Sequence, residues 1–94
     1  MKARGSKYGA FIDHARIVQN LKTAMRDSPN WNRLPPDQTE CLEMVAHKIG
    51  RILNGDHNHH DSWHDIEGYV HLVTQRIEED ENNRTGTEVS RRDP

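Results

Sequence analysis

The chain lacks the means to form an intrachain disulfide, because Cys41 is its only cysteine. Five aromatic residues and a hydrophobic content of 32% are a small supply for the core of a 94-residue protein. An apolar run of the roughly 18 residues that span a membrane is also missing, as is a signal-peptide pattern at the N-terminus. These absences argue against a secreted scaffold and predict a soluble cytoplasmic protein in which Cys41 is a small buried group.

The net charge of −2 conceals two segments of opposite sign. Residues 1–33 carry seven lysines or arginines against two acids, whereas residues 34–78 carry three against eight. An anionic ligand would therefore bind to the first third of the chain, although the two segments can equally attract one another within a fold or an oligomer. Because the apolar supply is small, we expect the chain to gain stability by self-association.

Apolar residues recur at helical spacing in three segments, and strand-like alternation is absent. The first segment covers residues 8–25 and ends at the Ser-Pro-Asn sequence of residues 28–30, because proline disfavours helical geometry in the residue before it. The second opens with the two prolines of residues 35–36. It closes at Gly55, which is expected to adopt the left-handed conformation of a helix C-cap.

The third segment is expected to begin near Ser62, with Asp61 or Ser62 as its N-cap. Its apolar residues form a strict seam suited to packing against another helix, from the same chain or from a partner: Trp63, Ile66, Val70, Val73 and Ile77. Glycine inside a helix costs about 1 kcal/mol relative to alanine, and a close helix approach often offsets that cost. We therefore expect a tight crossing at Gly50 or Gly68.

Together these segments predict an all-α fold, a compact bundle of one N-terminal helix and an antiparallel helix pair. Residues 1–78 would form the single domain. Residues 79–94 are strongly charged and have one large apolar side chain, so a disordered C-terminal tail is expected there.

Four of the seven histidines lie in GDHNHHDSWHDIEGY, residues 55–69. A zinc site needs three or four ligands that converge on a tetrahedron, often at i and i+4 on a helix. His60 and His64 have that spacing only if the helix already includes residue 60. We interpret the segment as the end of one helix, a polar turn and the capped start of the next, and we predict no metal site.

Two alternative functions follow from other patterns. Glu40 and Glu43 form an ExxE pair like the one with which all-helical nucleoside triphosphate pyrophosphohydrolases hold magnesium. The second, ExxD pair of those enzymes is absent, although Asp65 can supply a third carboxylate. A solvated helix face is the favoured interpretation of the glutamates, with the magnesium-dependent enzyme as the alternative. The seam of the third segment leaves a helical protein-interaction module open as well.

Four stretches of the chain, RGSKYGAF, NWNRL, CLEMVAHKIGRILNGD and DSWHDIEGYVHLV, together resemble a family of small tailed-phage proteins. Some members of that family are cyclic-oligonucleotide sponges that defeat the bacterial CBASS defence. The resemblance covers roughly residues 4–75. It implies a helical homohexamer in the host bacterial cytoplasm that sequesters cyclic di- and trinucleotides, such as cyclic GMP-AMP, without cleaving them. No catalytic residue, metal, cofactor, membrane or polymeric nucleic acid is then expected.

The resemblance also implies the ligand-binding residues. In the family, a tyrosine near the N-terminus stacks on a base and a lysine about four turns later serves the phosphate, and the matching positions here are Tyr8 and Lys22. Arg26 lies one turn beyond the lysine and can add a phosphate contact. Ser6 and Gly9 can offer a hydroxyl and an uncrowded backbone amide to the same dinucleotide site.

The spacing of this pair has a geometric consequence. If residues 8–22 formed one helix, Tyr8 and Lys22 would lie about 21 Å apart along it, which one small ligand cannot easily bridge. This predicts dinucleotide pockets at a twofold interface between protomers, unless Gly9 places Tyr8 on a loop that folds back. The resemblance also implies a second, trinucleotide site where several protomers meet. Arg51 lies in the best-matching segment and is assigned to that site, with an ion pair to a helix acid as the open alternative.

Overall fold

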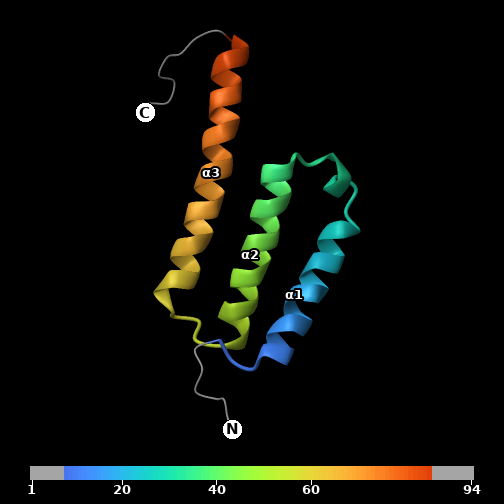
Figure 1. Cartoon of the computed structure of the whole chain (residues 1–94), viewed down its shortest axis with the longest axis vertical. Helices are drawn as coiled ribbons and strands as arrows, with labels where there is room; N and C mark the ends of the chain where they lie inside the picture. Colours follow the sequence, from blue (N-terminus) through green and yellow to red (C-terminus); the bar gives the residue numbers. More distant parts are fainter. Residues whose placement is uncertain (1–7, 86–94) are drawn as a thin grey trace.

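The computed structural model describes residues 8–85, which form three α-helices and one 3-10 turn. In chain order these are α1 (Phe11–Arg26), η1 (Trp31–Arg33), α2 (Pro36–Asn54) and α3 (His60–Thr85). Consecutive helices run antiparallel, and α1 and α3 flank α2 on opposite sides (Figure 1). Because the described part of the chain contains helices and no strand, the all-α prediction with three helices is confirmed.

The helices form a flat layer rather than the compact bundle that we expected. The fold extends 15 Å along its shortest axis, half of the 30 Å along the next one, because α1 and α3 pack on opposite sides of α2 (Figure 1). A single layer encloses few side chains, and the buried hydrophobic residues among those described are Val18, Cys41 and Ala46. Burial of the Cys41 thiol confirms its interpretation as a small core group, and burial and the nearby Asp37 raise its pKa.

The helices α1 and α2 approach each other closely at Gly50. A Cβ atom on this glycine would lie 2.5 Å from Val18 Cγ2 and 2.9 Å from His14 Nδ1. Both partners are buried, at 2% and 8% exposure. By contrast, a Cβ on Gly68 would meet nothing within 4 Å. The expected tight crossing therefore exists at Gly50, and only hydrogen at this position lets α1 lie so close to α2.

Two ion pairs connect α3 to α2. Lys48 Nζ lies 2.9 Å from Asp65 Oδ2, and the lysine is only 8% exposed, so this carboxylate compensates a largely buried charge. Farther along, Arg76 Nε and Nη2 donate to the two carboxylate oxygens of Asp37 at 2.9 and 2.8 Å. This bidentate pair fixes the start of α2 against the middle of α3.

Three expected helix ends differ from the structure. The first helix begins at Phe11 rather than at Tyr8. Gly55 has a φ of −147°, so the expected left-handed C-cap is wrong; the positive φ among the described residues belongs to Gly9, at 72°. The third helix begins at His60, and Ser62, expected as a cap, lies inside it and is 3% exposed.

The end of the third helix is also later than expected. Residues 79–85 were assigned to a disordered tail, but α3 continues to Thr85. Arg76 Nη1 donates to Asp80 Oδ2 at 3.0 Å, an i,i+4 pair that supports the helix beyond the seam. Residues 86–94 lie outside the described part of the chain.

Apolar side chains remain uncovered on this layer. Val70 is 46% exposed and Ile77 is 39% exposed, although both belong to the seam of α3. Neither α1, α2 nor α3 contains an apolar stretch long enough to cross a lipid bilayer.

Replacement of Gly50 by alanine tests the crossing. Alanine favours a helix intrinsically, but its Cβ would collide with Val18, so we expect Gly50→Ala to lower the free energy of unfolding by about 1–3 kcal/mol. Gly68→Ala is the matched control, because it adds the same methyl group in open space and should raise stability by up to about 1 kcal/mol. Urea unfolding followed by circular dichroism measures both changes. Equal stabilisation by the two alanines would contradict the crossing.

Candidate functional site

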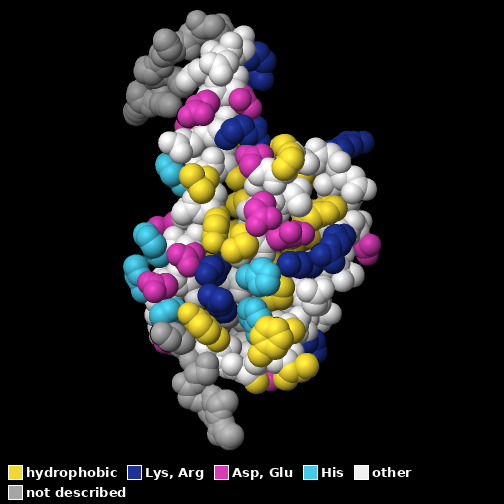
Figure 2. Space-filling view, in the orientation of Figure 1, with side chains coloured by type: hydrophobic (Ala, Val, Ile, Leu, Met, Phe, Trp, Pro, Cys, Tyr) yellow, Lys and Arg dark blue, Asp and Glu magenta, His cyan; other side chains and the backbone are white. Residues whose placement is uncertain are grey.

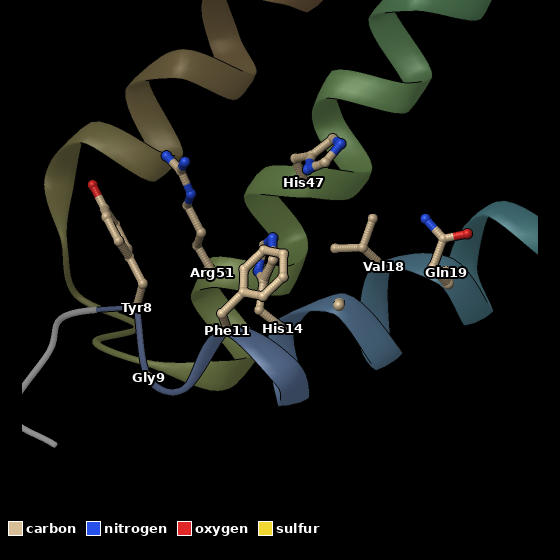
Figure 3. A pocket seen from close by; sticks show the side chains of 9 residues that line it. Tyr8, Gly9, Phe11, His14, Val18, Gln19, His47 and Arg51 are labelled. Carbon is tan, nitrogen blue, oxygen red and sulfur yellow. The ribbon is translucent and has the colours of Figure 1, made fainter. Parts of the chain in front are cut away.

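A cavity of about 390 Å³ opens between the beginning of α1 and the second half of α2. We call it the α1–α2 pocket. Its volume falls within the range of about 300–1,000 Å³ that is usual for small-molecule sites. The described residues that line it come from the N-terminal loop and both helices, and none is acidic: Tyr8, Gly9, Phe11, His14, Ala15, Val18, Gln19, His47 and Arg51 (Figure 3).

Tyr8 reaches the pocket because the chain turns sharply before α1. Gly9 has a φ of 72°, a conformation that other residues rarely adopt, and a Cβ there would overlap Asn54. The Asn54 side-chain amide donates to the carbonyl oxygens of Tyr8 and Ala10, each at 2.9 Å. The alternative in which Gly9 folds Tyr8 back on a loop is therefore confirmed, and the helical geometry behind the 21 Å separation is wrong.

The Tyr8 ring stands beside the last turn of α2. The guanidinium carbon of Arg51 lies 4.4 Å from the ring centroid, which is a cation–π contact. The ring of His59 approaches the tyrosine edge-on, with a centroid distance of 5.9 Å. Figure 3 shows Tyr8 and Arg51 side by side at one end of the pocket. This end of the pocket therefore offers an aromatic ring and a planar cation side by side.

Two histidines and a lysine form the next part of the site. Lys22 Nζ lies 3.3 Å from His47 Nε2, and because an ammonium only donates, this nitrogen accepts and His47 is neutral. The rings of His14 and His47 are 5.9 Å apart. Burial first, then the charge of Lys22, and then His14 and Arg51 lower the pKa of His47, while Glu43 opposes them.

His14 lies deeper, where α1 crosses α2. Burial and the Arg51 charge lower its pKa, and the Gly50 backbone offsets them only in part. Its Nδ1 has no hydrogen-bond partner of good geometry, so the imidazole is held neutral by its surroundings. The site therefore combines the fixed cations Lys22 and Arg51 with two neutral imidazoles. Figure 2 shows basic and histidine side chains gathered with hydrophobic ones on this face of the molecule.

The structure brings together some of the residues selected from the sequence. Tyr8 and Gly9 line the pocket, and Lys22 adjoins it through its contact with His47. Arg51, assigned to a separate site, lines the same pocket as Tyr8 and contacts its ring. Arg26 is exposed in the last turn of α1 and is not among the described residues that line the cavity. Ser6 lies outside the described residues.

The histidine-rich loop and the carboxylate set make other contacts. Because α3 includes residue 60, His60 and His64 do share a face, and their rings stack with centroids 5.5 Å apart. Asp65, the third carboxylate of the pyrophosphohydrolase alternative, binds Lys48. Within residues 8–85, no group of three or more His, Cys, Asp or Glu side chains is placed to hold a metal ion.

Three residues of the site were not predicted from the sequence: His14, His47 and Asn54. A signal for His14 was available, because this polar residue stands on the apolar stripe of the first helix, three residues after Phe11 and four before Val18. His47 precedes Arg51 by one helical turn and so shares its face. Nothing local marks Asn54 as the residue that holds a loop 44 to 46 positions earlier.

Comparisons of the chain with protein-family models, with curated proteins and with solved structures give no match.

The lowered pKa values of His14 and His47 predict a pH-dependent stability. Below about pH 6.5 the unfolded chain takes up protons at these positions before the folded chain does, so unfolding becomes more favourable. The stability present above that pH is lost as the pH falls toward the pKa values that the two histidines have in the folded protein. We expect the urea midpoint to decrease from pH 7.5 to pH 5.5, and His47→Gln or His14→Gln to flatten the decrease. His71→Gln, which removes an exposed histidine of α3, should leave the slope unchanged; a slope insensitive to all three variants would refute this explanation.

Proposed function

We propose that the α1–α2 pocket binds one nucleotide unit of a cyclic oligonucleotide, and that the protein sequesters such second messengers without cleaving them. The observation that carries this proposal is the pairing of the Tyr8 ring with the Arg51 guanidinium, 4.4 Å away, in a pocket that Lys22 adjoins through His47. The resemblance to the phage sponge family supports it independently, since Tyr8 and Lys22 are the positions that match that family's ligand-binding residues.

The chemistry of binding follows from these three side chains. A base stacked on an aromatic ring contributes about 1–3 kcal/mol, and any base can stack. In this proposal the base takes the face of Tyr8 that Arg51 covers in the free protein. The released guanidinium then turns to a phosphate, which it recognises with paired donors, and Lys22 supplies a second positive charge. No acidic side chain among the described lining residues opposes the anion.

The size of the pocket explains why one nucleotide unit is proposed. A cavity of about 390 Å³ lies at the lower end of the small-molecule range, so the rest of a cyclic ligand extends beyond it. Phe11 borders the pocket and is 79% exposed, and the adjacent Ile12 is 74% exposed. In the proposed homo-oligomer, a hexamer as in the family, another protomer covers such side chains together with the protruding part of the ligand.

Depletion and recovery of the ligand test the function directly. The protein is incubated with cyclic GMP-AMP, the free nucleotide is measured after ultrafiltration, and the protein is then denatured by heat. We expect the free ligand to fall and intact cyclic GMP-AMP to return on heating. In a parallel incubation with nucleoside triphosphates in the presence of magnesium, a pyrophosphohydrolase would instead hydrolyse the triphosphates with water to monophosphate and pyrophosphate. A protein-interaction module would leave both kinds of nucleotide in solution unchanged.

Single substitutions test the pocket. Tyr8→Ala, Arg51→Ala and Lys22→Ala should each weaken cyclic GMP-AMP binding by roughly 10-fold or more, as the loss of a stacking or charge-assisted contact implies. Arg16→Ala is the matched control, because it removes a positive charge from α1 at an exposed position that pairs with Asp13 at 3.8 Å. Isothermal titration calorimetry measures the affinities. A loss as large in Arg16→Ala would mean that net charge, and not the pocket, governs binding.

The apolar hollow between α2 and α3 offers a test of self-association. This hollow of about 320 Å³ is lined mostly by apolar residues, with Leu42 exposed on α2 and Val70 and Ile77 exposed on α3. If a second protomer covers it, Val70→Glu should shift the assembly toward the monomer, because burial of an unpaired carboxylate is costly. Thr74→Glu, which puts the same charge at a polar lining position, is the comparison variant. Light scattering coupled to size-exclusion chromatography measures the mass, and an unchanged oligomer in Val70→Glu would exclude this surface.

A further inference from the structure

His47 presents a hydrogen-bond acceptor at a position where a bound phosphate would need a donor. Its Nε2 lies 3.3 Å from Lys22 Nζ and accepts a hydrogen bond from it. Phosphate oxygens in a diester also only accept hydrogen bonds. A phosphate that binds Lys22 at the edge of the pocket therefore faces the lone pair of a neutral imidazole, and the contact is repulsive until that nitrogen carries a proton.

The groups that face His47 explain why it is neutral without a ligand. From α1 it faces the Lys22 ammonium and the His14 ring, and from its own helix it faces Arg51 and Glu43. Burial, and then two fixed cations against one carboxylate, disfavour a further positive charge and lower the pKa of His47. An incoming phosphate reverses this balance, because its negative charge lies close to the imidazole and is poorly screened within a pocket.

We infer that His47 is a phosphate-binding residue that takes up one proton from solvent when the ligand binds and then donates from Nε2 to the phosphate beside Lys22. This inference rests on the proposed function for the identity of the natural ligand. Only one proton is transferred, from a water or buffer acid to the imidazole, and no covalent bond of the ligand changes. His47 thereby becomes a third positive charge of the site, present only in the complex.

His14 does not share this role. It is 8% exposed and lies against the Gly50 backbone at the helix crossing, where a Cβ would be 2.9 Å from its Nδ1. His47 is half-buried and faces both the cavity and the ammonium of Lys22. Figure 3 shows His47 projecting from α2 toward the pocket, with His14 behind Phe11. The two histidines therefore have different tasks, one in helix packing and one in binding.

Proton uptake makes the affinity depend on pH. In the range where His47 is neutral in the free protein and charged in the complex, the dissociation constant decreases by up to about tenfold for each unit by which the pH falls. Outside that range the affinity levels off on both sides. A site built only from lysine and arginine would show no such dependence near neutral pH, because both remain charged there.

Nuclear magnetic resonance of the imidazole protons tests the inference at His47 itself. The pKa of His47 is measured in the intact protein alone, with saturating cyclic GMP-AMP, and with inorganic pyrophosphate as a ligand that contains no base. The His47 signal is assigned by its loss in His47→Gln, a variant that keeps a hydrogen-bonding amide but cannot titrate. We expect a higher pKa of His47 with the nucleotide, and an affinity for cyclic GMP-AMP that rises from pH 8 to pH 6 in the wild type and in His71→Gln but not in His47→Gln.

The outcomes separate this inference from the proposed function. Binding of cyclic GMP-AMP without a change in the pKa of His47 would overturn the proton uptake and leave the sponge function intact. A pKa raised by pyrophosphate alone, with no nucleotide binding, would support His47 as a phosphate residue and overturn the sponge. An unchanged pKa with both ligands would overturn the inference outright.

Discussion

The absence of a side chain at Gly50 is the constraint on which the rest of the structure depends. Because only a hydrogen stands there, Val18 and His14 of α1 pack directly against the backbone of α2. This close approach buries Val18 and His14, and it also fixes the distance between the two helices that form the walls of the α1–α2 pocket. A larger residue would separate the walls, so the same contact serves both stability and the shape of the site.

The helices were predictable because their signals are local. Apolar spacing places α1 and α2, and the prolines at residues 35–36 open α2. The cost of glycine in a helix pointed to a close crossing at Gly50 or Gly68, and the structure has it at Gly50. The position of Tyr8 was not predictable to the same degree. It depends on the positive φ of Gly9, because a glycine in the sequence allows this conformation but does not require it. It also depends on Asn54, which is distant along the chain and whose side chain binds the backbone of the loop.

The end of α3 was misjudged for a related reason. A run of acidic residues without apolar side chains resembles a disordered segment, because it contributes nothing to a core. Here Arg76 binds Asp37 of α2 and Asp80 one turn later, so a single guanidinium anchors the helix and supports its continuation. The site was likewise only half visible from the sequence: Tyr8 and Lys22 came from the resemblance, whereas the partnership of Arg51 and His47 with them required the three-dimensional arrangement.

The order of the helices has a consequence for how the protein forms. Each helix packs mainly on its neighbour along the chain, so the loops to be closed are short and their entropic cost is small. Helical proteins with such local topology typically reach their native state within microseconds to milliseconds. Every described residue that lines the α1–α2 pocket lies between positions 8 and 51, within the first helical hairpin. During synthesis on the ribosome, the components of the pocket therefore leave the exit tunnel before α3 does.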